Sequence, residues 1–211
     1  MSVLPRLPTY DEVYRQFRWQ VPARYNIGVD VCDRWALAEP DRLAILHVHA
    51  DGREETVSYG ALRDRSNRLA NVLQAQGVKR GDRVAIMLPQ MPEVATAHVA
   101  IYKLGAVALP VAALFGPDAL RYRLQNSGAR ALITDAAGLA KLDSVRHEVP
   151  DLSCVLLVEN FSDVLARASS DVTPVDTSAD DPALMIYTSG TTGQPKGALQ
   201  AHRVLLGHLP G

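Results

Sequence analysis

Short apolar segments alternate with longer amphipathic segments over most of the chain after residue 80. The apolar segments lack the alternation of a half-exposed strand, which predicts buried strands at 83–88, 106–110, 131–134, 155–158 and 183–187. The segments between them predict helices at 92–104, 117–125, 136–148 and 161–169. Buried strands separated by helices are typical of a doubly wound, mostly parallel sheet that helices cover on both faces. We therefore predict an α/β fold.

A predicted hairpin and a long helix precede this region. Residues 44–49 and 55–58 have the composition of two strands, and the Asp-Gly pair at 51–52 is a hairpin turn signal. Ser58 can cap the helix that follows, because its hydroxyl can accept a hydrogen bond from a free backbone N–H. Gly77 can end the same helix, because glycine adopts the left-handed conformation that helix ends use.

The first forty residues do not share these patterns. They are polar, contain several prolines, and show only one short amphipathic stretch, at 29–37. We therefore predict an irregular N-terminal arm over 1–40 and a single, incomplete α/β subdomain over 41–211.

The composition is that of a globular protein, with 47% hydrophobic and 21% charged residues in a chain of 211. A formal net charge of −1 provides no basic surface for nucleic acid. The longest apolar run, 104–116, contains a proline and is shorter than the roughly 20 residues of a spanning helix. The N-terminus lacks the apolar segment of a secretory signal, and the two cysteines form neither a disulfide framework nor a metal-spaced cluster. We predict a cytoplasmic protein with no membrane span, no nucleic-acid partner and no metal-ligating residues.

Residues 187–197, directly after the last predicted strand, concentrate the candidate chemistry. They read Tyr-Thr-Ser-Gly-Thr-Thr-Gly-Gln-Pro-Lys-Gly. Glycine lets the backbone approach a ligand closely, and successive N–H groups can form an anion-binding nest. The hydroxyls add donors, and Lys196 adds a compact positive charge that suits phosphate. Because ligands of open α/β sheets bind at the carboxyl ends of strands, the pattern favours a phosphate-binding loop.

The same residues have two other interpretations, a Walker A loop and a flexible linker. A Walker A loop has Gly-Lys followed by Ser or Thr, whereas Pro195 precedes Lys196 here and Gly197 follows it, so a P-loop kinase or GTPase is disfavoured. A flexible linker rich in Gly, Ser and Thr, with an incidental lysine, is the other interpretation, because such turns commonly follow strands. Composition alone leaves both the phosphate loop and the linker open.

The segment 188–197 resembles the signature of the adenylate-forming enzymes, which include acyl-CoA synthetases, the adenylation domains of peptide synthetases, and luciferases. Every position of Thr-Ser-Gly-Thr-Thr-Gly-Gln-Pro-Lys-Gly matches that signature. Residues 56–62, 77–86 and 103–110 are similar to the same family, so the resemblance extends over nearly the whole chain. The residues after the loop, 198–208, are most similar to acetyl- and medium-chain acyl-CoA synthetases.

The resemblance implies an ATP-dependent carboxylate–CoA ligase. In this family a carboxylic acid reacts with Mg²⁺-bound ATP to give an acyl-adenylate and pyrophosphate, and the thiol of coenzyme A then displaces AMP. The resemblance implies that Lys196 supplies the catalytic positive charge on the departing phosphates. It also implies a nucleotide-binding set consisting of Thr188, Ser189, Gly190, Thr191, Thr192, Gly193, Lys196 and Gly197.

Members of this family are usually more than twice as long as this chain, which implies an N-terminal part of a larger enzyme. The segments that bind adenine, ribose and Mg²⁺ in the family would then lie outside it. We expect the chain alone to fold without catalysing, and to self-associate through the apolar face that the remainder would cover. Two alternatives stay open: an amino-acid-activating adenylation domain that loads a carrier protein, and a non-catalytic module that binds a nucleotide or a protein partner.

His202, just after the loop, has two interpretations. Family members often have a histidine at this position, which suits a role near the phosphates or the acyl group. A histidine that packs against a helix or faces solvent is equally compatible with the sequence. His202 is therefore not among the predicted site residues.

Overall fold

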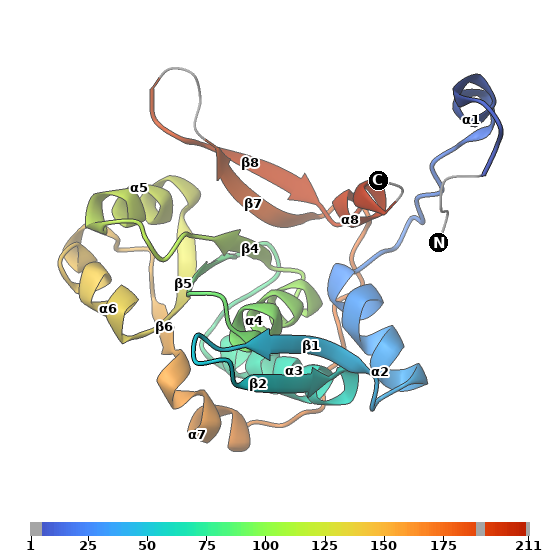
Figure 1. Cartoon of the computed structure of the whole chain (residues 1–211). Helices are drawn as coiled ribbons and strands as arrows, with labels where there is room; N and C mark the ends of the chain where they lie inside the picture. The colour runs from blue at the N-terminus through green and yellow to red at the C-terminus, as the bar shows by residue number, and fades with distance from the viewer. Residues whose placement is uncertain (1–5, 189–192, 210–211) are drawn as a thin grey trace.

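The structure of the chain is a computed structural model that describes residues 6–188 and 193–209. Its centre is a six-stranded sheet in the order β6-β5-β3-β4-β7-β8 (Figure 1). The strands are β3 (Arg83–Met87), β4 (Val107–Pro110), β5 (Ala129–Thr134), β6 (Cys154–Leu157), β7 (Pro182–Thr188) and β8 (Lys196–Ala201). All neighbours pair in parallel except β7 and β8, which are antiparallel. The predicted doubly wound, mostly parallel sheet is confirmed.

Helices cover both faces of this sheet, as predicted. One face carries α3 (Tyr59–Ala75), α4 (Pro92–Lys103) and α7 (Phe161–Ala166), and the other carries α5 (Pro117–Ser127) and α6 (Ala136–Asp143). In Figure 1, α5 and α6 lie to the left of β5, and α3 and α4 lie to its right. Along β5, Ala131 and Ile133 join the core beneath α3 and α4, while Leu132 joins the core beneath α5. No helix in the described ranges has the length and hydropathy needed to cross a membrane.

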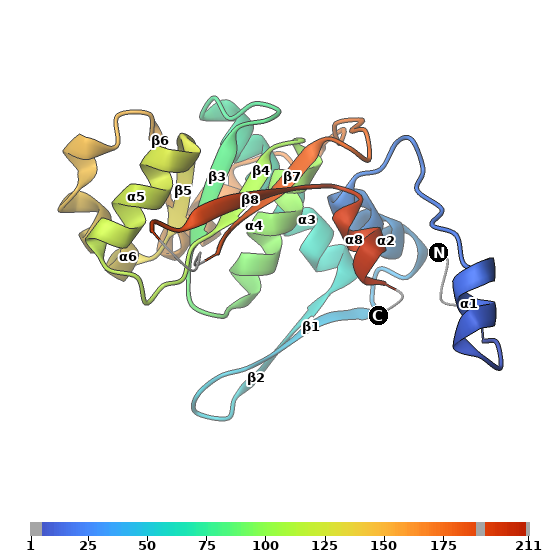
Figure 2. The same cartoon turned by 90° about the horizontal axis from the view of Figure 1, so that it is seen from above.

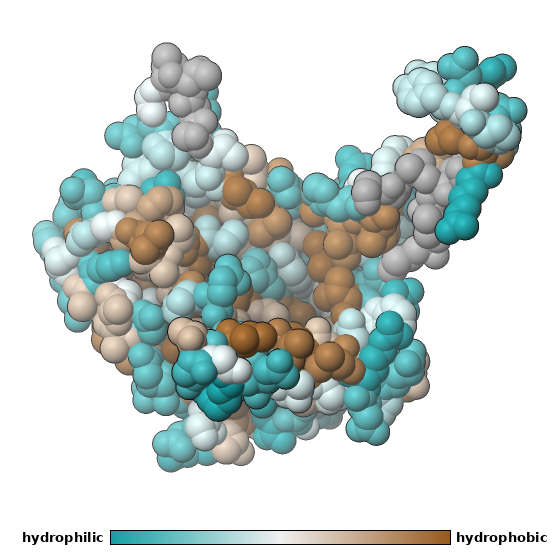
Figure 3. Space-filling model, viewed as in Figure 1, coloured by the Kyte–Doolittle hydropathy of each residue, from teal (hydrophilic) through white to brown (hydrophobic). Residues whose placement is uncertain are grey.

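The predicted hairpin is confirmed as a separate two-stranded antiparallel sheet of β1 (Leu43–Val48) and β2 (Glu54–Ser58). Figure 2 shows it projecting from the body of the domain. Leu43, Leu46 and Val48 are 53%, 51% and 56% exposed. Figure 3 shows the resulting apolar surface along β1.

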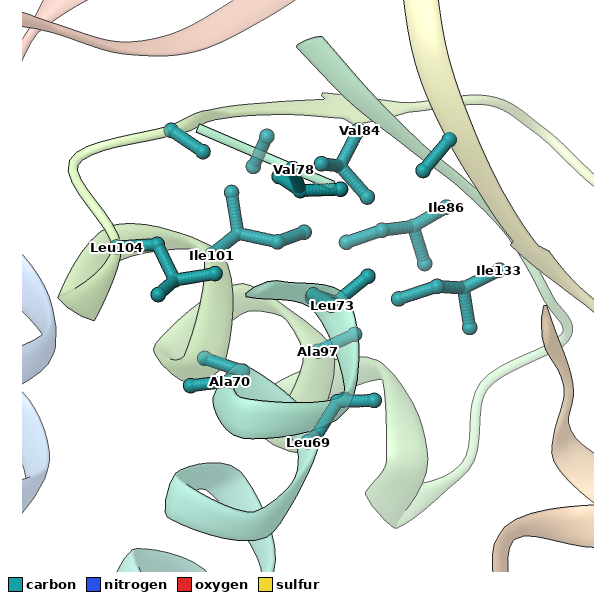
Figure 4. Close-up of a cluster of buried hydrophobic side chains, with 14 of the residues drawn as sticks. Leu69, Ala70, Leu73, Val78, Val84, Ile86, Ala97, Ile101, Leu104 and Ile133 are labelled. Carbon is teal, nitrogen blue, oxygen red and sulfur yellow. The ribbon is translucent and has the colours of Figure 1, made fainter. Parts of the chain in front are cut away.

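The helix α3 forms where its sequence pattern predicts it. Ser58 Oγ accepts a hydrogen bond from the N–H of Ala61 at 3.2 Å, and Gly77, with φ of +87°, follows the last turn. One face of the helix, consisting of Leu62, Ser66, Leu69, Ala70 and Leu73, is buried. Leu69, Ala70 and Leu73, with side chains of α4 and the sheet, belong to the larger of the two cores beside the sheet (Figure 4).

Three elements differ from the predictions. The helix predicted at 161–169 is shorter, since α7 ends at Ala166. The strand β8 is not among the predicted strands, because its sequence has no continuous apolar run and its β structure comes from pairing with β7. The helix predicted at 136–148 is shorter, since α6 ends at Asp143 and Arg146–Glu148 form a separate 3₁₀ turn. Val145 leaves the helical conformation, with φ of −125°, and its side chain is only 6% exposed.

The first forty residues contain more regular structure than the irregular arm that was predicted. They form α1 (Tyr10–Gln16), a π-helical turn (Val29–Asp33) and α2 (Arg34–Ala38). The helix α1 buries no residue and lies apart from the sheet (Figure 1). Ile27 and Cys32, by contrast, are buried against the domain. The division into 1–40 and 41–211 stays a prediction.

Candidate functional site

The predicted phosphate loop joins β7 to β8 at the end of their antiparallel pair. Thr188 lies opposite Lys196, and Tyr187 lies opposite Gly197. Because directly opposite residues share a face of the sheet, the exposed side chains of Thr188 and Lys196 lie on the same side. The structure therefore brings together these two members of the predicted site. Four further members, Ser189, Gly190, Thr191 and Thr192, lie outside the described residues.

Gly193 and Gly197 are glycines for two different reasons, backbone conformation at Gly193 and close packing at Gly197. Gly193 has φ of +92°, a conformation that favours glycine over residues with a Cβ atom. At Gly197, a Cβ atom would lie 3.2 Å from Cζ of Tyr187 and 3.1 Å from Sδ of Met185. Gly197 therefore makes room for the tyrosine ring, a packing reason for glycine that is independent of any ligand.

Two hydrogen bonds with α5 hold Tyr187, just before the loop, and Pro195, the last residue before β8. The hydroxyl of Tyr187 donates to Oδ1 of Asn126 at 2.6 Å, and the hydroxyl of Tyr122 donates to the carbonyl of Pro195 at 2.9 Å. Burial raises the pKa of Tyr187, so its hydroxyl keeps the proton that it donates. Sequence reasoning missed these residues. The sequence contains one signal for them: Tyr122 and Asn126 are about one helical turn apart, so they lie on the same face of the predicted helix.

Two cations, Lys196 and Arg123, lie beside the β7–β8 hairpin. Lys196 is exposed at the first position of the edge strand, and no carboxylate of the described residues lies within ion-pair distance of it. The guanidinium of Arg123 lies 4.0 Å from the ring centre of Phe115 and 5.5 Å from that of Tyr187. In the part of the chain that the structure describes, Arg123 also makes no ion pair. Arg123 is only 7% exposed, so Lys196 is the cation of this pair that can meet a ligand in solvent. An exposed cation without a neighbouring carboxylate favours an anionic ligand.

His202 does not lie at the loop. It follows the end of β8 remote from Lys196, and an extended strand of that length spans about 20 Å. Its ring is fully buried, accepts a hydrogen bond at Nδ1 from the N–H of Ile27 at 3.2 Å, and packs edge-on against Tyr102. The structure therefore supports the packing interpretation of His202.

Acid should destabilise the fold through two buried histidines. Burial lowers the pKa of both His98 and His202 to about 4, whereas an unfolded histidine has a pKa of about 6.5. Below about pH 6.5 the unfolded chain therefore binds protons that the folded chain excludes, and stability falls as the pH drops towards 4. At pH 5.5 the expected loss is about 1 kcal/mol for each histidine.

Urea unfolding at pH 7.5 and pH 5.5 measures this loss. His202→Gln should remove about half of the histidine contribution to the difference. His147→Gln is the control, because that side chain is 79% exposed and should leave the difference unchanged. An undiminished pH effect in His202→Gln would show that His202 is not held neutral by the fold.

Comparisons with known proteins identify the family of the chain. The family model described as AMP-binding enzyme matches residues 32–209. Over 196 residues the chain is 35% identical to an acetyl-coenzyme A synthetase of Halorhodospira halophila, a match that covers 82% of this chain and 30% of that protein. The chain thus spans about a third of the length of the curated relatives that it matches.

Solved structures share the same fold. An acyl-CoA synthetase of Brucella canis matches with a TM-score of 0.83 and 28% identity, over 95% of this chain and 39% of that one. ATP-bound MatB of Rhodopseudomonas palustris matches with a TM-score of 0.74 and 31% identity, over 86% of this chain and 36% of that one. The sheet, the signature segment between β7 and β8, and a family match over most of the chain lead to one conclusion: the chain belongs to the AMP-binding enzyme family.

Proposed function

We propose that the chain provides the phosphate-binding part of an AMP-forming, ATP-dependent carboxylate–CoA ligase. The main observation in support is the β7–β8 hairpin, which sets Lys196 opposite Thr188 directly after a parallel strand. Ligands of open α/β sheets bind at that end of the strands. The acetyl-CoA and acyl-CoA synthetases among the similar proteins support the same activity.

The residues at the hairpin fit a triphosphate. Lys196 offers a positive charge, Thr188 a hydroxyl, and Gly193 a backbone with positive φ that a ligand can approach closely. No carboxylate of the described residues competes for the lysine. From the signature segment we also assign to the nucleotide Ser189, Gly190, Thr191, Thr192 and Gly197.

In the proposed first step, a carboxylate oxygen of the substrate attacks the α-phosphorus of ATP. The bond from that phosphorus to its bridging oxygen breaks, and pyrophosphate leaves with the electron pair. Lys196 stabilises the negative charge that builds on the departing phosphates, and it needs only to be correctly placed to do so. In the second step, the thiol sulfur of coenzyme A attacks the acyl carbon and loses its proton to solvent. The bond from that carbon to the phosphate oxygen of AMP breaks, and AMP leaves with the electron pair. Pyrophosphate has already gone, so the phosphates on which Lys196 acts are absent from this step.

The proposed reaction also needs Mg²⁺ and coenzyme A, and we assign no residue of this chain to bind either of them. Within residues 6–188 and 193–209, no three His, Cys, Asp or Glu side chains are grouped so that they could hold a metal ion. Magnesium commonly binds through phosphate oxygens, waters and one or two carboxylates, and we propose that it enters with ATP.

The proposal predicts carboxylate-dependent exchange of labelled pyrophosphate into ATP by the protein that carries this chain. Acetate, butyrate and octanoate test acyl chain length, and added coenzyme A tests thioester formation. Exchange with amino acids, followed by transfer to the phosphopantetheine of a carrier protein and not to coenzyme A, would instead show the adenylation-domain alternative. ATP binding without exchange for any acid would show the non-catalytic module.

The 211-residue chain by itself should bind MgATP with millimolar or weaker affinity and release no pyrophosphate. A few hydrogen bonds to a solvated triphosphate are each worth about 0.5–1.5 kcal/mol, and association costs at least about 4 kcal/mol. Calorimetric titration measures the affinity, and sedimentation tests the proposed self-association of its exposed apolar surface. Micromolar binding or any turnover would show that the chain contains a complete site.

A further inference from the structure

Tyr187, just before the signature segment, and Pro195, within it, are attached to the same helix. On the β7 side, the hydroxyl of Tyr187 donates to Asn126 at 2.6 Å. On the β8 side, the hydroxyl of Tyr122 donates to the carbonyl of Pro195 at 2.9 Å. The rings of Tyr122 and Tyr187 meet edge to face, with their centres 6.2 Å apart. A single turn of α5 therefore contacts the chain immediately before Thr188 and immediately before Lys196.

The contact at Pro195 lies at the open end of the hairpin, just before β8 begins. Lys196 is the first residue of β8, and β8 is the edge strand of the sheet, so it pairs with β7 alone. Proline has no N–H, so Pro195 can join the sheet or any other partner only through its carbonyl. That carbonyl is the group that Tyr122 binds. Without this bond, the described backbone before Lys196, residues 193–195, would have no hydrogen bond to α5.

The ring of Tyr187 packs closely between β8 and α5. Gly197 leaves room for the ring, since a Cβ atom there would lie 3.2 Å from Cζ of Tyr187. Arg123, on the same helix, places its guanidinium 5.5 Å from the centre of that ring. Its NH1 also donates to the carbonyl of Ala119 at 2.8 Å, which fixes the guanidinium on α5.

We propose that Tyr122 and Asn126 are positioning residues that hold Lys196 in register for the triphosphate. The inference rests on the proposed function, because it needs Lys196 to act on the phosphates. Neither residue touches the ligand in this proposal. Tyr122 fixes the backbone that enters Lys196, and Asn126 fixes the opposite strand through Tyr187, so α5 supports the pairing of Lys196 with Thr188 that the hairpin makes.

The first test measures the attachment without any enzymatic activity. Trypsin cleaves after lysine, and mass spectrometry identifies the peptide that ends at Lys196. Tyr122→Phe keeps the ring and removes only the hydroxyl, so cleavage at Lys196 should become roughly 2- to 10-fold faster, the change expected for one lost hydrogen bond. Asn126→Ala, at an exposed position, should act in the same direction.

The matched control is Tyr25→Phe, which removes a hydroxyl that donates to Asp30 at 2.7 Å, outside α5 and the hairpin. It should leave cleavage at Lys196 unchanged. Equal cleavage rates in Tyr122→Phe and the unchanged protein would overturn the proposal.

The second test uses pyrophosphate exchange by the protein that carries this chain. Tyr122→Phe should raise KM for MgATP or lower kcat/KM for it by roughly 2- to 10-fold, while KM for the carboxylic acid stays the same. A purely structural loss would change KM for MgATP and KM for the carboxylic acid together, and that result would overturn the positioning role. Unchanged ATP kinetics in a variant that trypsin cleaves faster at Lys196 would overturn it as well. If Lys196→Ala leaves exchange unchanged, the proposed function is wrong, and the cleavage rates still decide whether α5 holds the hairpin.

Discussion

Replacing Lys196 by alanine should slow acyl-adenylate formation by about 10- to 100-fold in the protein that carries this chain. A hydrogen bond to a charged group is worth about 1.5–3 kcal/mol, and each 1.4 kcal/mol changes a rate about tenfold. The lysine acts on charge that develops as pyrophosphate departs, so most of this energy is gained in the transition state. Single-turnover pyrophosphate release with saturating ATP and acid measures the effect.

The second half-reaction provides the internal control for Lys196. Thioester formation from preformed acyl-adenylate should be nearly unaffected, because pyrophosphate has already left. Lys79→Ala is the matched control variant, since Lys79 is an exposed lysine remote from the β7–β8 hairpin in sequence. If Lys196→Ala slows both half-reactions equally, the lysine supports the structure and not the departing phosphates.

Replacing Asp33 by alanine should lower the free energy of unfolding by about 3–5 kcal/mol. Its Oδ1 atom lies 2.6 Å from Nζ of Lys103, whose side chain is fully buried. Lys103 also donates to Oγ of Ser66 at 3.0 Å and to Oδ1 of Asn67 at 2.6 Å. Without Asp33, the ammonium would keep these two neutral acceptors but lose its counter-charge. Urea unfolding at pH 7 measures the loss.

The pH dependence identifies the cause of that loss. Burial already lowers the pKa of Lys103, and removal of Asp33 should lower it further because Asp33 favours the charged form. A lowered lysine pKa means that stability rises with pH, so the loss in Asp33→Ala should shrink towards pH 10. Asp33→Ala combined with Lys103→Met should be more stable than Asp33→Ala alone, since no unpaired charge remains.

The control for Asp33 is Asp64→Ala, which removes a surface pair with Arg68. The carboxylate of Asp64 is 48% exposed, and such pairs contribute at most about 1 kcal/mol. A loss in Asp33→Ala no larger than that of Asp64→Ala would contradict a buried, charged Lys103. The same result tests how the N-terminal residues are attached to the domain, because Asp33 belongs to the turn Val29–Asp33 and pairs with Lys103 of α4.

The strand β3 shows why much of the sheet could be predicted. Val84 to Met87 are all buried, and an uninterrupted apolar run can be satisfied only where both faces of the strand are covered. The strand β8 could not be predicted in this way, because its first four residues are exposed and it has no uninterrupted apolar run. Its strand structure depends on hydrogen bonds to β7, and pairing of that kind leaves no periodic trace in the sequence.

The candidate site divides in the same way. The hydroxyls, glycines and lysine of the signature segment are contiguous, so their chemistry and their place after a strand could be predicted. The attachment to α5 could not, because Tyr122 and Pro195 are 73 residues apart in the chain. His202 illustrates a third case, in which the sequence left two roles open and burial against Ile27 and Tyr102 distinguished them.

The sequence by itself determined the α/β class, the caps of α3 and the family, because each depends on residues that are neighbours along the chain or on one contiguous motif. Only the tertiary structure decided which cation is buried and which is exposed. Lys103 is enclosed because α3, α4 and the segment around Asp33 converge on it, whereas Lys196 stays open because β8 has a neighbour on one side alone. The electrostatic character of each lysine follows from how the elements pack around it, and packing between distant segments is not encoded in any local pattern.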